Sequence, residues 1–205
     1  GTSSEITNVS ALTDTVKVVK YVVIDDKLVP SHVICDPEFT RTVPGFVTAA
    51  TGMDAITHAV ESYISNCATP LSKYHAVQAL KVFYDALPKA VANGNDMEAR
   101  ENMMLGCIIV GYSFLNANLG LVHAIAHTLS ARNHLSHGNA NATVLPYVMR
   151  FNAPSCPEMM IELAEAIGIP MTGDKDKDMY ALADALLELR KTVGIKSLSE
   201  LGVTE

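Results

Sequence analysis

Four of the seven histidines lie within one stretch of fifteen residues, from His123 to His137. His123 and His127 are four residues apart, and His134 and His137 follow them. Residues four apart lie on the same face of a helix, so we expect His123 and His127 to point the same way. Neutral imidazole is a common ligand of divalent transition metals. The stretch is therefore a candidate source of metal ligands.

A second pair with the same spacing, Asp54 and His58, lies upstream in a segment that is otherwise apolar on that side. Burying a carboxylate and an imidazole without partners is costly. Two such helices facing each other could bring oxygen and nitrogen ligands around one divalent cation. Each histidine taken alone is better explained as a satisfied core or surface residue. The spacing by itself leaves both interpretations open.

The composition predicts a folded chain with a large core. Of the 205 residues, 49% are hydrophobic and 18% are charged, against about 25% charged in typical domains. The formal net charge is 15 − 22 = −7 and no dense run of Lys or Arg occurs, so we expect no nucleic-acid partner. The longest apolar run, 103–115, is shorter than the roughly 20 residues of a membrane span and contains Gly106 and Gly111. We therefore expect a buried helix there and no membrane partner.

The four cysteines stand far apart in the sequence, and no Cys-x-x-Cys pair occurs. This spacing does not resemble a disulfide framework. We interpret the cysteines as reduced thiols of a protein located in the cytoplasm.

The secondary-structure signals change at Pro44. Before it, 16–24 and 32–35 are rich in β-branched residues and predict short strands. After it, the pattern predicts helices, with stop signals such as Gly168 and Gly194. The predicted helices are 44–65, 70–92, 97–116, 119–132, 138–152, 156–167, 177–193 and 197–201.

Two long motifs make the sequence recognisable. The stretch VICDPEFTRTVPGFVTAATGMDAITHAVE, from Val33 to Glu61, resembles the first signature of the iron-containing (group III) alcohol dehydrogenases. The stretch from Gly120 to Ala140, which begins GLVHAIAH and ends LSHGNA, resembles the second. The resemblance covers nearly the whole chain. It implies a mainly α fold with two parts. Residues 41–205 would form an all-helical metal-binding and catalytic domain of a dehydroquinate synthase-like fold. Residues 1–40 would be a short β-rich remnant of an α/β nucleotide-binding domain.

The resemblance also implies a ligand set for one metal ion. Carried over by motif position, the ligands are Asp54, His58, His123 and His137, and all four are present. Zinc-using relatives such as glycerol dehydrogenase have one histidine fewer, so the full set favours Fe²⁺, although Zn²⁺ suits the same ligand types. We expect each helical histidine to have its second ring nitrogen bonded to a carbonyl or a carboxylate.

Other residues receive roles from the same resemblance. His127 matches a histidine close to the substrate and the nicotinamide, and it would act as the catalytic residue that relays the hydroxyl proton. Phe114 matches an aromatic residue that lines the alcohol pocket, although an ordinary core position explains it as well. Thr2 and Thr7 match threonines near the nicotinamide and the phosphates, and Lys20 matches a lysine that contacts the cofactor ribose.

The implied activity is hydride transfer between a small alcohol or diol, or the aldehyde in reverse, and NAD(H) or NADP(H). Relatives bind the pyrophosphate with a Gly-Gly-Gly-Ser loop in a domain before the point where this sequence starts, whereas all twelve glycines here are isolated. We therefore expect a middle-to-C-terminal piece of a longer dehydrogenase that is inactive alone. Exposed strand edges favour association, so we also expect a homodimer.

Two other functions remain open at this point. A metal-dependent hydrolase would use the same ion to activate water, and Glu61 is the nearby candidate for its general base. A non-catalytic helical domain would use the ion only for stability. Formation of NADH from 1,2-propanediol or butanol would indicate the dehydrogenase, whereas hydrolysis of esters or phosphoesters would indicate the hydrolase. A closed four-ligand ion without exchangeable water would favour the non-catalytic domain.

Overall fold

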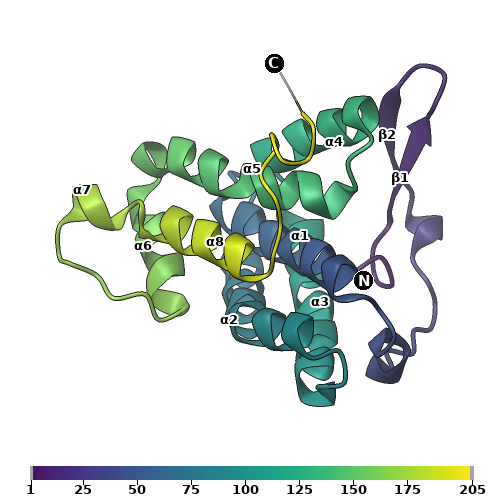
Figure 1. The fold of residues 1–205 in the computed structure, drawn as a ribbon, viewed down its shortest axis with the longest axis horizontal. Helices are drawn as coiled ribbons and strands as arrows, with labels where there is room; N and C mark the ends of the chain where they lie inside the picture. Colours follow the sequence, from purple (N-terminus) through teal and green to yellow (C-terminus); the bar gives the residue numbers. More distant parts are fainter. Residues whose placement is uncertain (1, 204–205) are drawn as a thin grey trace.

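In the computed structural model, which describes residues 2–203, a β-hairpin precedes eight α-helices (Figure 1). The strands are β1 (Val9–Asp14) and β2 (Val19–Ile24), and they pair antiparallel with Val9 opposite Ile24. The helices are α1 (Gly45–Ile64), α2 (Pro70–Ala92), α3 (Met97–Ala117), α4 (Leu121–Asn133), α5 (His137–Asn152), α6 (Pro157–Ala166), α7 (Lys175–Asp178) and α8 (Ala181–Thr192). Short 3-10 helices are η1 (Asp26–Leu28), η2 (Pro37–Thr40) and η3 (Ala153–Ser155). The prediction of a mainly α fold is confirmed.

Helix α1 lies at the centre of the helical part. It packs against α2, α3 and α5, and from Thr48 to Tyr63 every residue except Thr51 is buried. A helix that is apolar on all sides is typical of one surrounded by other helices. The polar side chains that α1 does bury therefore need partners from neighbouring elements.

The helix ends follow local side-chain chemistry. Thr69 and Ser72 form a capping box at the start of α2, and Asp96 accepts a hydrogen bond from the backbone N–H of Ala99 at the start of α3. Gly168 and Gly194, which follow α6 and α8, have φ values of 81° and 75°, a conformation that favours glycine. These signals are why the predicted bounds of the first six helices agree with the structure to within two residues.

Three predicted elements are corrected by the structure. The predicted helix 177–193 is divided into α7 and α8, and the predicted helix 197–201 is a set of hydrogen-bonded turns, in which Ser197 donates to Glu200. Such a short segment gains too few hydrogen bonds to offset helix nucleation. The predicted strand 32–35 has no partner strand among the described residues and is not a strand.

The hairpin also differs from its prediction. The predicted strand 16–24 contains β2 and the turn before it, where the carboxylate of Asp14 accepts hydrogen bonds from the backbone N–H groups of Val16 and Lys17. Strand β1 was not predicted, because its sequence VSALTD carries only a weak alternation of apolar and polar residues.

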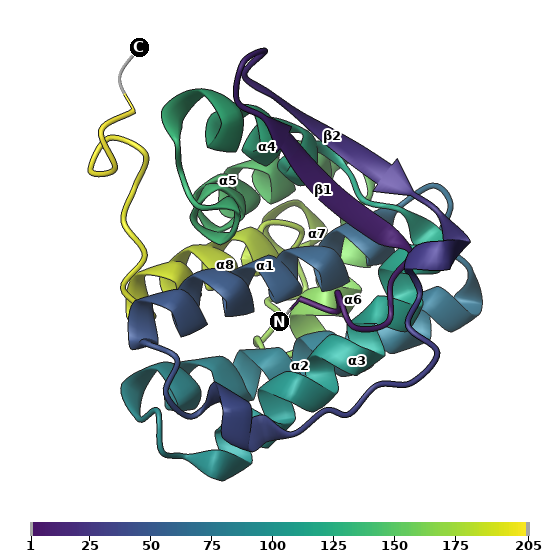
Figure 2. The ribbon, with the colours of Figure 1, turned by 90° about the vertical axis from the view of Figure 1, so that its right-hand side faces the viewer.

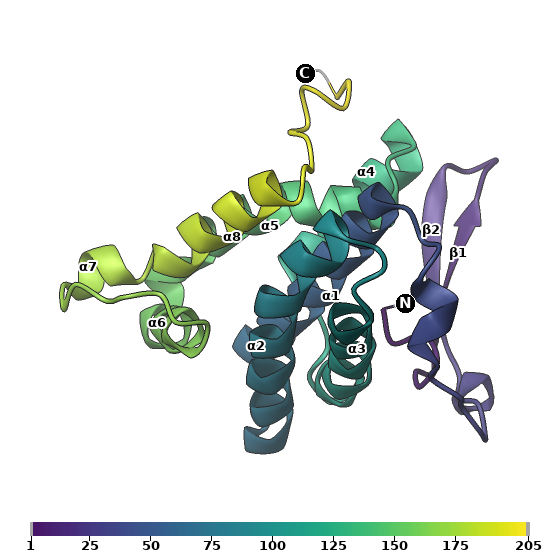
Figure 3. The same cartoon turned by 60° about the horizontal axis from the view of Figure 1, so that its bottom comes forward.

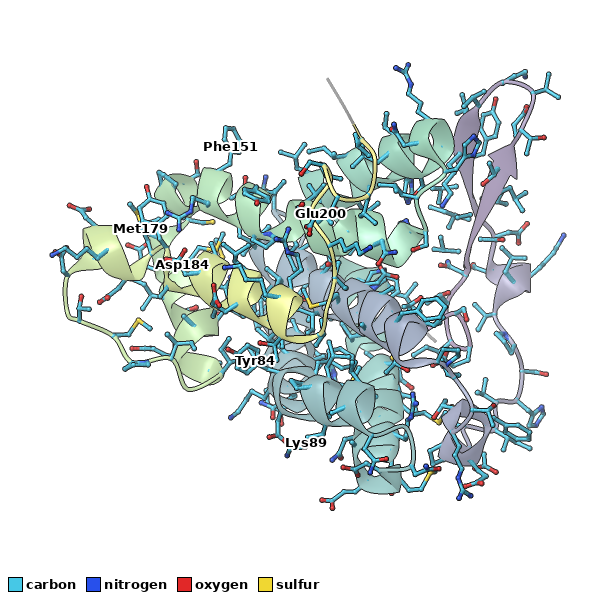
Figure 4. All side chains as sticks on the ribbon, viewed as in Figure 1. Tyr84, Lys89, Phe151, Met179, Asp184 and Glu200 are labelled. Carbon is cyan, nitrogen blue, oxygen red and sulfur yellow. The ribbon has the colours of Figure 1, made fainter. Side chains whose placement is uncertain are left out.

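The hairpin and the last helices lie at opposite ends of the molecule. Strand β2 packs beside α4, and the hairpin covers that side of the helical part (Figure 2). Helices α6 and α7 lie at the far end, and α8 runs from there back along α5 (Figure 3). Some large apolar side chains remain on the surface, such as Phe151, which projects from α5 and is 74% exposed (Figure 4).

No single helix of residues 2–203 is long and apolar enough to cross a membrane, although α3 and α4, bent by 103° at their junction, pass the same test as a pair.

Candidate metal centre

The structure brings the four predicted metal ligands together around one carboxylate. Asp54 and His58 lie on α1, His123 on α4, and His137 is the first residue of α5. The Oδ1 atom of Asp54 is 3.6 Å from Nε2 of His123 and 3.6 Å from Nε2 of His137. One possible donor atom each from Asp54, His58 and His123 lies within 4.8 Å of the other two. Three helices therefore converge on one small polar volume.

Asn141 lies between these donor atoms and was not predicted from the sequence. It is fully buried on α5, and its Nδ2 is 2.5 Å from Oδ1 of Asp54. The same Nδ2 atom is 3.1 Å from Nε2 of His137 and 3.3 Å from Nε2 of His123. Its Oδ1 has no hydrogen-bond partner among the described residues. The signal that could have found it is its spacing, four residues after His137 on the same helix face.

Glu61 is the second residue whose contact was missed. It is buried on α1, and its Oε2 atom is 2.6 Å from Nδ1 of His123. The expectation that each helical histidine has its second ring nitrogen bonded is met by this contact. It is wrong at His137, whose Nε2 faces Asp54 while its Nδ1 is buried without a hydrogen-bond partner in the part of the chain that the structure describes. Nδ1 of His58 is buried without such a partner as well.

The electrostatics of the cluster favour a positive charge beside Asp54. Burial raises the pKa of Asp54, but the surrounding imidazoles, His58 first, outweigh burial and hold that pKa below its usual range. Burial lowers the pKa of His58 and that of His137 to about 4, against the attraction of Asp54. For His123, burial again lowers the pKa, but Asp54 and Glu61 outweigh it and raise the pKa to about 9.

The donor set suits a transition-metal ion. It consists of an ionised carboxylate and imidazoles, which are ligands of Fe²⁺ and Zn²⁺. No Lys or Arg forms an ion pair with Asp54 among residues 2–203, so the counter-charge of this carboxylate must come from the imidazoles or from a cation that they hold. Binding would displace the protons that compete for these nitrogens.

A cavity of about 520 Å³ opens beside the cluster. Asp54 and the three predicted ligand histidines line it, as do Thr2, Thr7, Phe114 and His127. The ring of Phe114 stacks on that of His58, with centroids 4.5 Å apart and planes at 24°. Most of the predicted site residues therefore border one space.

The segment that carries Thr2 and Thr7 packs against α3, and this packing places both threonines at the cavity. A Cβ atom at Gly111 would lie 2.4 Å from Cδ1 of Ile6, so glycine at this position lets the Ile6 side chain pack directly against α3. The hydroxyl of buried Ser3 donates to the carbonyl of Cys107 on the same helix.

His127 and Lys20 lie at the edge of the cluster. The ring centroid of His127 is 5.0 Å from that of His137. Burial, then His123, then Lys20 lower the pKa of His127, which favours the neutral form of the ring. Burial also lowers the pKa of Lys20 on β2, while Asp54 opposes that effect, which places the ammonium within electrostatic reach of the carboxylate.

The remaining histidines lie outside the cluster. His134 ends α4 in a left-handed conformation with a φ of 55° and is exposed. His32 is exposed, and His75 contacts the rings of Tyr74 and Tyr112.

Comparison with known sequences identifies relatives over the whole chain. The model of the Fe-containing alcohol dehydrogenase family, C-terminal part, matches residues 48–205. A 1,3-propanediol dehydrogenase of Klebsiella pneumoniae is 43% identical over all of this chain and 54% of its own length. An NAD-dependent methanol dehydrogenase of Bacillus methanolicus is 41% identical over all of this chain and 54% of its own length. The chain therefore spans about half the length of the curated relatives it matches.

Solved structures of relatives have the same fold. The crystal structure of a 1,3-propanediol oxidoreductase superposes with a TM-score of 0.94 at 41% identity, covering 100% of this chain and 54% of that one. A sulfoacetaldehyde reductase from Bifidobacterium kashiwanohense, solved in complex with NAD+, superposes with a TM-score of 0.88 at 35% identity, covering 100% and 53%.

Proposed function

The chain belongs to the iron-containing alcohol dehydrogenase family, and from this premise we propose that Asp54, His58, His123 and His137 bind one divalent cation, Fe²⁺ or Zn²⁺. The observation that carries the proposal is the convergence of three helices on the carboxylate of Asp54, with Nε2 of His123 and Nε2 of His137 each 3.6 Å from its Oδ1. A bound cation of this kind supplies Lewis acidity, which lowers the pKa of a hydroxyl group.

We propose that His127 moves the proton of the substrate hydroxyl. Its imidazole is half-buried, borders the same cavity as the cluster, and has a pKa that burial lowers, which favours the neutral form. A neutral imidazole accepts a proton readily in this pH range. The hydroxyl proton would pass to His127 as the alcohol becomes the aldehyde, and it would return in the reverse reaction.

The cavity wall favours a small substrate with a short alkyl chain. Phe114, Leu115 and Leu119 supply apolar surface beside the polar cluster. We propose that a small primary alcohol or diol lies there and that the hydride of its carbinol carbon passes to C4 of a nicotinamide. The products are the aldehyde and NADH or NADPH. The names of the relatives, with 1,3-propanediol and methanol as alcohols, support this substrate class.

We assign the nicotinamide side of the cavity to Thr2, Thr7 and Lys20. The two threonines border the cavity, and Lys20 brings a positive charge that suits a phosphate or a ribose hydroxyl. We further propose that 41–205 acts as the metal-binding and catalytic domain and 1–40 as part of the nucleotide-binding domain. A homodimer and a cytoplasmic location stay predictions.

No observation favours the hydrolase. Its general base would have to face the cavity, whereas Glu61 accepts hydrogen bonds from Nδ1 of His123 and from the backbone N–H of Val122. Both contacts direct its carboxylate at the start of α4. A purely stabilising ion accounts for the cluster but leaves the neutral His127 and the adjoining cavity unused.

Metal analysis and a paired activity assay test the proposal. We expect one equivalent of Fe²⁺ or Zn²⁺ in the reconstituted protein, and strong loss of metal in His58→Ala and His137→Ala. The protein in the length at which it exists in the cell should form NADH from 1,2-propanediol or butanol and should not hydrolyse esters or phosphoesters. Unchanged metal stoichiometry in both variants would overturn the metal site.

A further inference from the structure

We propose that Glu61 is a positioning residue that orients the imidazole of His123 and sets the start of α4 against α1. This inference rests on the proposed metal site, because it concerns how one of the ligands is held. The observations that carry it are the burial of the Glu61 carboxylate, its hydrogen bonds to α4, and a glycine that makes room for it.

The Glu61 side chain is buried, at 1% exposure, and forms no ion pair with Lys or Arg among the described residues. Instead it accepts hydrogen bonds from three N–H groups of α4. The backbone N–H of Val122 is 2.7 Å from Oε1, the backbone N–H of His123 is 3.4 Å from Oε2, and Nδ1 of His123 is 2.6 Å from Oε2. A buried carboxylate is costly unless it is satisfied in this way.

The contact at Nδ1 decides which edge of the His123 ring faces the cluster. An ionised carboxylate can only accept, so Nδ1 must carry a hydrogen. Nε2 then lies on the other edge of the ring, 3.6 Å from Oδ1 of Asp54. Asp54 and Glu61 are seven residues apart on α1, which is about two helical turns, so they lie on the same face of this helix. Glu61 contacts the Nδ1 edge of the His123 ring, and Asp54 lies at the Nε2 edge.

The contacts at the backbone fix the helix that carries His123. Helix α4 has no side-chain cap from its own N-cap residue, Gly120. Glu61 supplies the acceptor that a cap would supply, and a negative charge at a helix N-terminus is favourable. A Cβ atom at Gly120 would lie 2.9 Å from Oε1 of Glu61, so glycine leaves room for the carboxylate.

Among the predicted metal-ligand histidines, the Glu61 carboxylate forms a hydrogen bond with the ring of His123. Nδ1 of His58 and Nδ1 of His137 are buried without a partner in the part of the chain described by the structure. His123 is therefore the predicted ligand whose outer nitrogen is held by a carboxylate. Groups that hold a metal-bound histidine from outside are worth about 10–100-fold in metal affinity.

The test compares Glu61→Gln with Glu101→Gln, an exposed carboxylate on α3. Glutamine keeps the shape of the side chain but loses the charge and one acceptor atom. We expect Glu61→Gln to weaken Zn²⁺ binding about 10–100-fold in competition with a chelator, and Glu101→Gln to leave it unchanged. Nitrogen NMR of the Zn²⁺-loaded wild type should show a His123 Nδ1–H protected by a strong hydrogen bond, and this signal should shift or disappear in Glu61→Gln but not in Glu101→Gln.

A second variant covers the case in which Glu61→Gln does not fold. Gly120→Ala keeps the carboxylate but displaces it, so it should also weaken Zn²⁺ binding and shift the Nδ1–H signal, while circular dichroism reports the helix content. Equal Zn²⁺ affinity and an unchanged signal in the folded variants would overturn the role of Glu61. Failure of the wild type to bind Zn²⁺ would instead overturn the proposed metal site.

Discussion

Gly138 on α5 lies directly against the main chain of Ala50 on α1, because a Cβ atom built on Gly138 would be 2.3 Å from the carbonyl oxygen of Ala50. Real Cβ atoms do not approach a carbonyl so closely, and backbone cannot move aside as a flexible side chain can. This approach brings the start of α5 onto α1, and with it His137, the residue before Gly138, to within 3.6 Å of Asp54.

Gly138→Ala should therefore separate α5 from α1. Alanine in a helix is usually favoured over glycine by roughly 0.5–1 kcal/mol. Here we expect the opposite: overpacking should lower the free energy of unfolding by about 1–3 kcal/mol and weaken metal binding. Urea unfolding and a Zn²⁺ titration measure both effects. Gly45→Ala is the comparison: its Cβ would lie 3.2 Å from the Val91 carbonyl oxygen, a much milder approach, so its loss of stability should be clearly smaller. A stabilised Gly138→Ala variant would show that the helices are not in tight contact.

A metal ion that binds the folded chain should stabilise it. At 100 times the dissociation constant, one Zn²⁺ ion adds about 2.7 kcal/mol to the free energy of unfolding, and a chelator should remove this gain. Asp54→Ala should abolish the gain, because the carboxylate lies at the centre of the cluster. His134→Ala, a histidine at the exposed end of α4, should keep it. Thermal unfolding with and without Zn²⁺ measures the difference, and an equal gain in Asp54→Ala would contradict the ligand assignment.

The turn between α3 and α4 holds a strained residue at the cavity. Asn118 has φ 63° and ψ −178°, a region occupied almost only by glycine, and it borders the cavity beside the cluster. Asn118→Gly should relieve about 1–3 kcal/mol of strain and raise the thermal midpoint. Asn116→Gly, two residues earlier inside α3, should lower stability by a few tenths to about 1 kcal/mol. Destabilisation of both variants would show that Asn118 is not strained.

The sequence predicts the helices better than the hairpin for a physical reason. Capping residues such as Thr69 and Asp96 and terminal glycines act within one helical turn, so they can be recognised locally. Whether a segment pairs as a strand depends on a partner elsewhere in the chain. The segment 32–35 has β-branched residues but no such partner among the described residues, and β1 pairs although its own pattern is weak.

The candidate site, like the fold, was predicted in part: local motifs identify its ligands, but not the contacts between helices. The spacing of Asp54 and His58 and the motif around His123 and His137 identify the groups that converge. The contact of Glu61 with His123 and the position of Asn141 among the donor atoms depend on the distance between helices. Such distances are set by close approaches of backbones, which single-residue patterns do not encode.

Acid should weaken the loop before α7. The carboxylate of Asp178 accepts hydrogen bonds from the backbone N–H of Thr172 at 2.9 Å, its hydroxyl at 2.8 Å and the backbone N–H of Gly173 at 2.8 Å. These bonds, the Thr172 N–H first, lower the pKa of Asp178. A carboxyl group whose pKa is lower in the folded than in the unfolded chain adds stability above the unfolded value, about 3.9, and loses it as the pH falls through the folded value.

Asp178→Asn should accordingly destabilise the protein at neutral pH, and the difference from wild type should shrink as the pH falls below about 4. Urea unfolding at several pH values measures it. Asp176→Asn, at an exposed position of α7, is the control and should show little difference at any pH. A difference for Asp178→Asn that stays constant down to pH 3 would contradict the role of the charged carboxylate.

The last prediction concerns nicotinamide binding by these 205 residues. The resemblance implies that relatives hold the pyrophosphate with a glycine-rich loop, and no two of the twelve glycines here are adjacent. Each backbone donor to a phosphate is a charge-assisted hydrogen bond worth about 1.5–3 kcal/mol. Three or four such bonds amount to several kcal/mol, and at about 1.4 kcal/mol per tenfold their absence changes a micromolar site into a millimolar one. We expect the 205-residue chain to bind Zn²⁺ in calorimetry but to give no micromolar NAD⁺ binding and negligible NAD-dependent turnover. The NAD-dependent methanol dehydrogenase of Bacillus methanolicus, at its own full length, is the positive control. Micromolar NAD⁺ binding by this chain would show that Thr2, Thr7 and Lys20 hold the cofactor without such a loop.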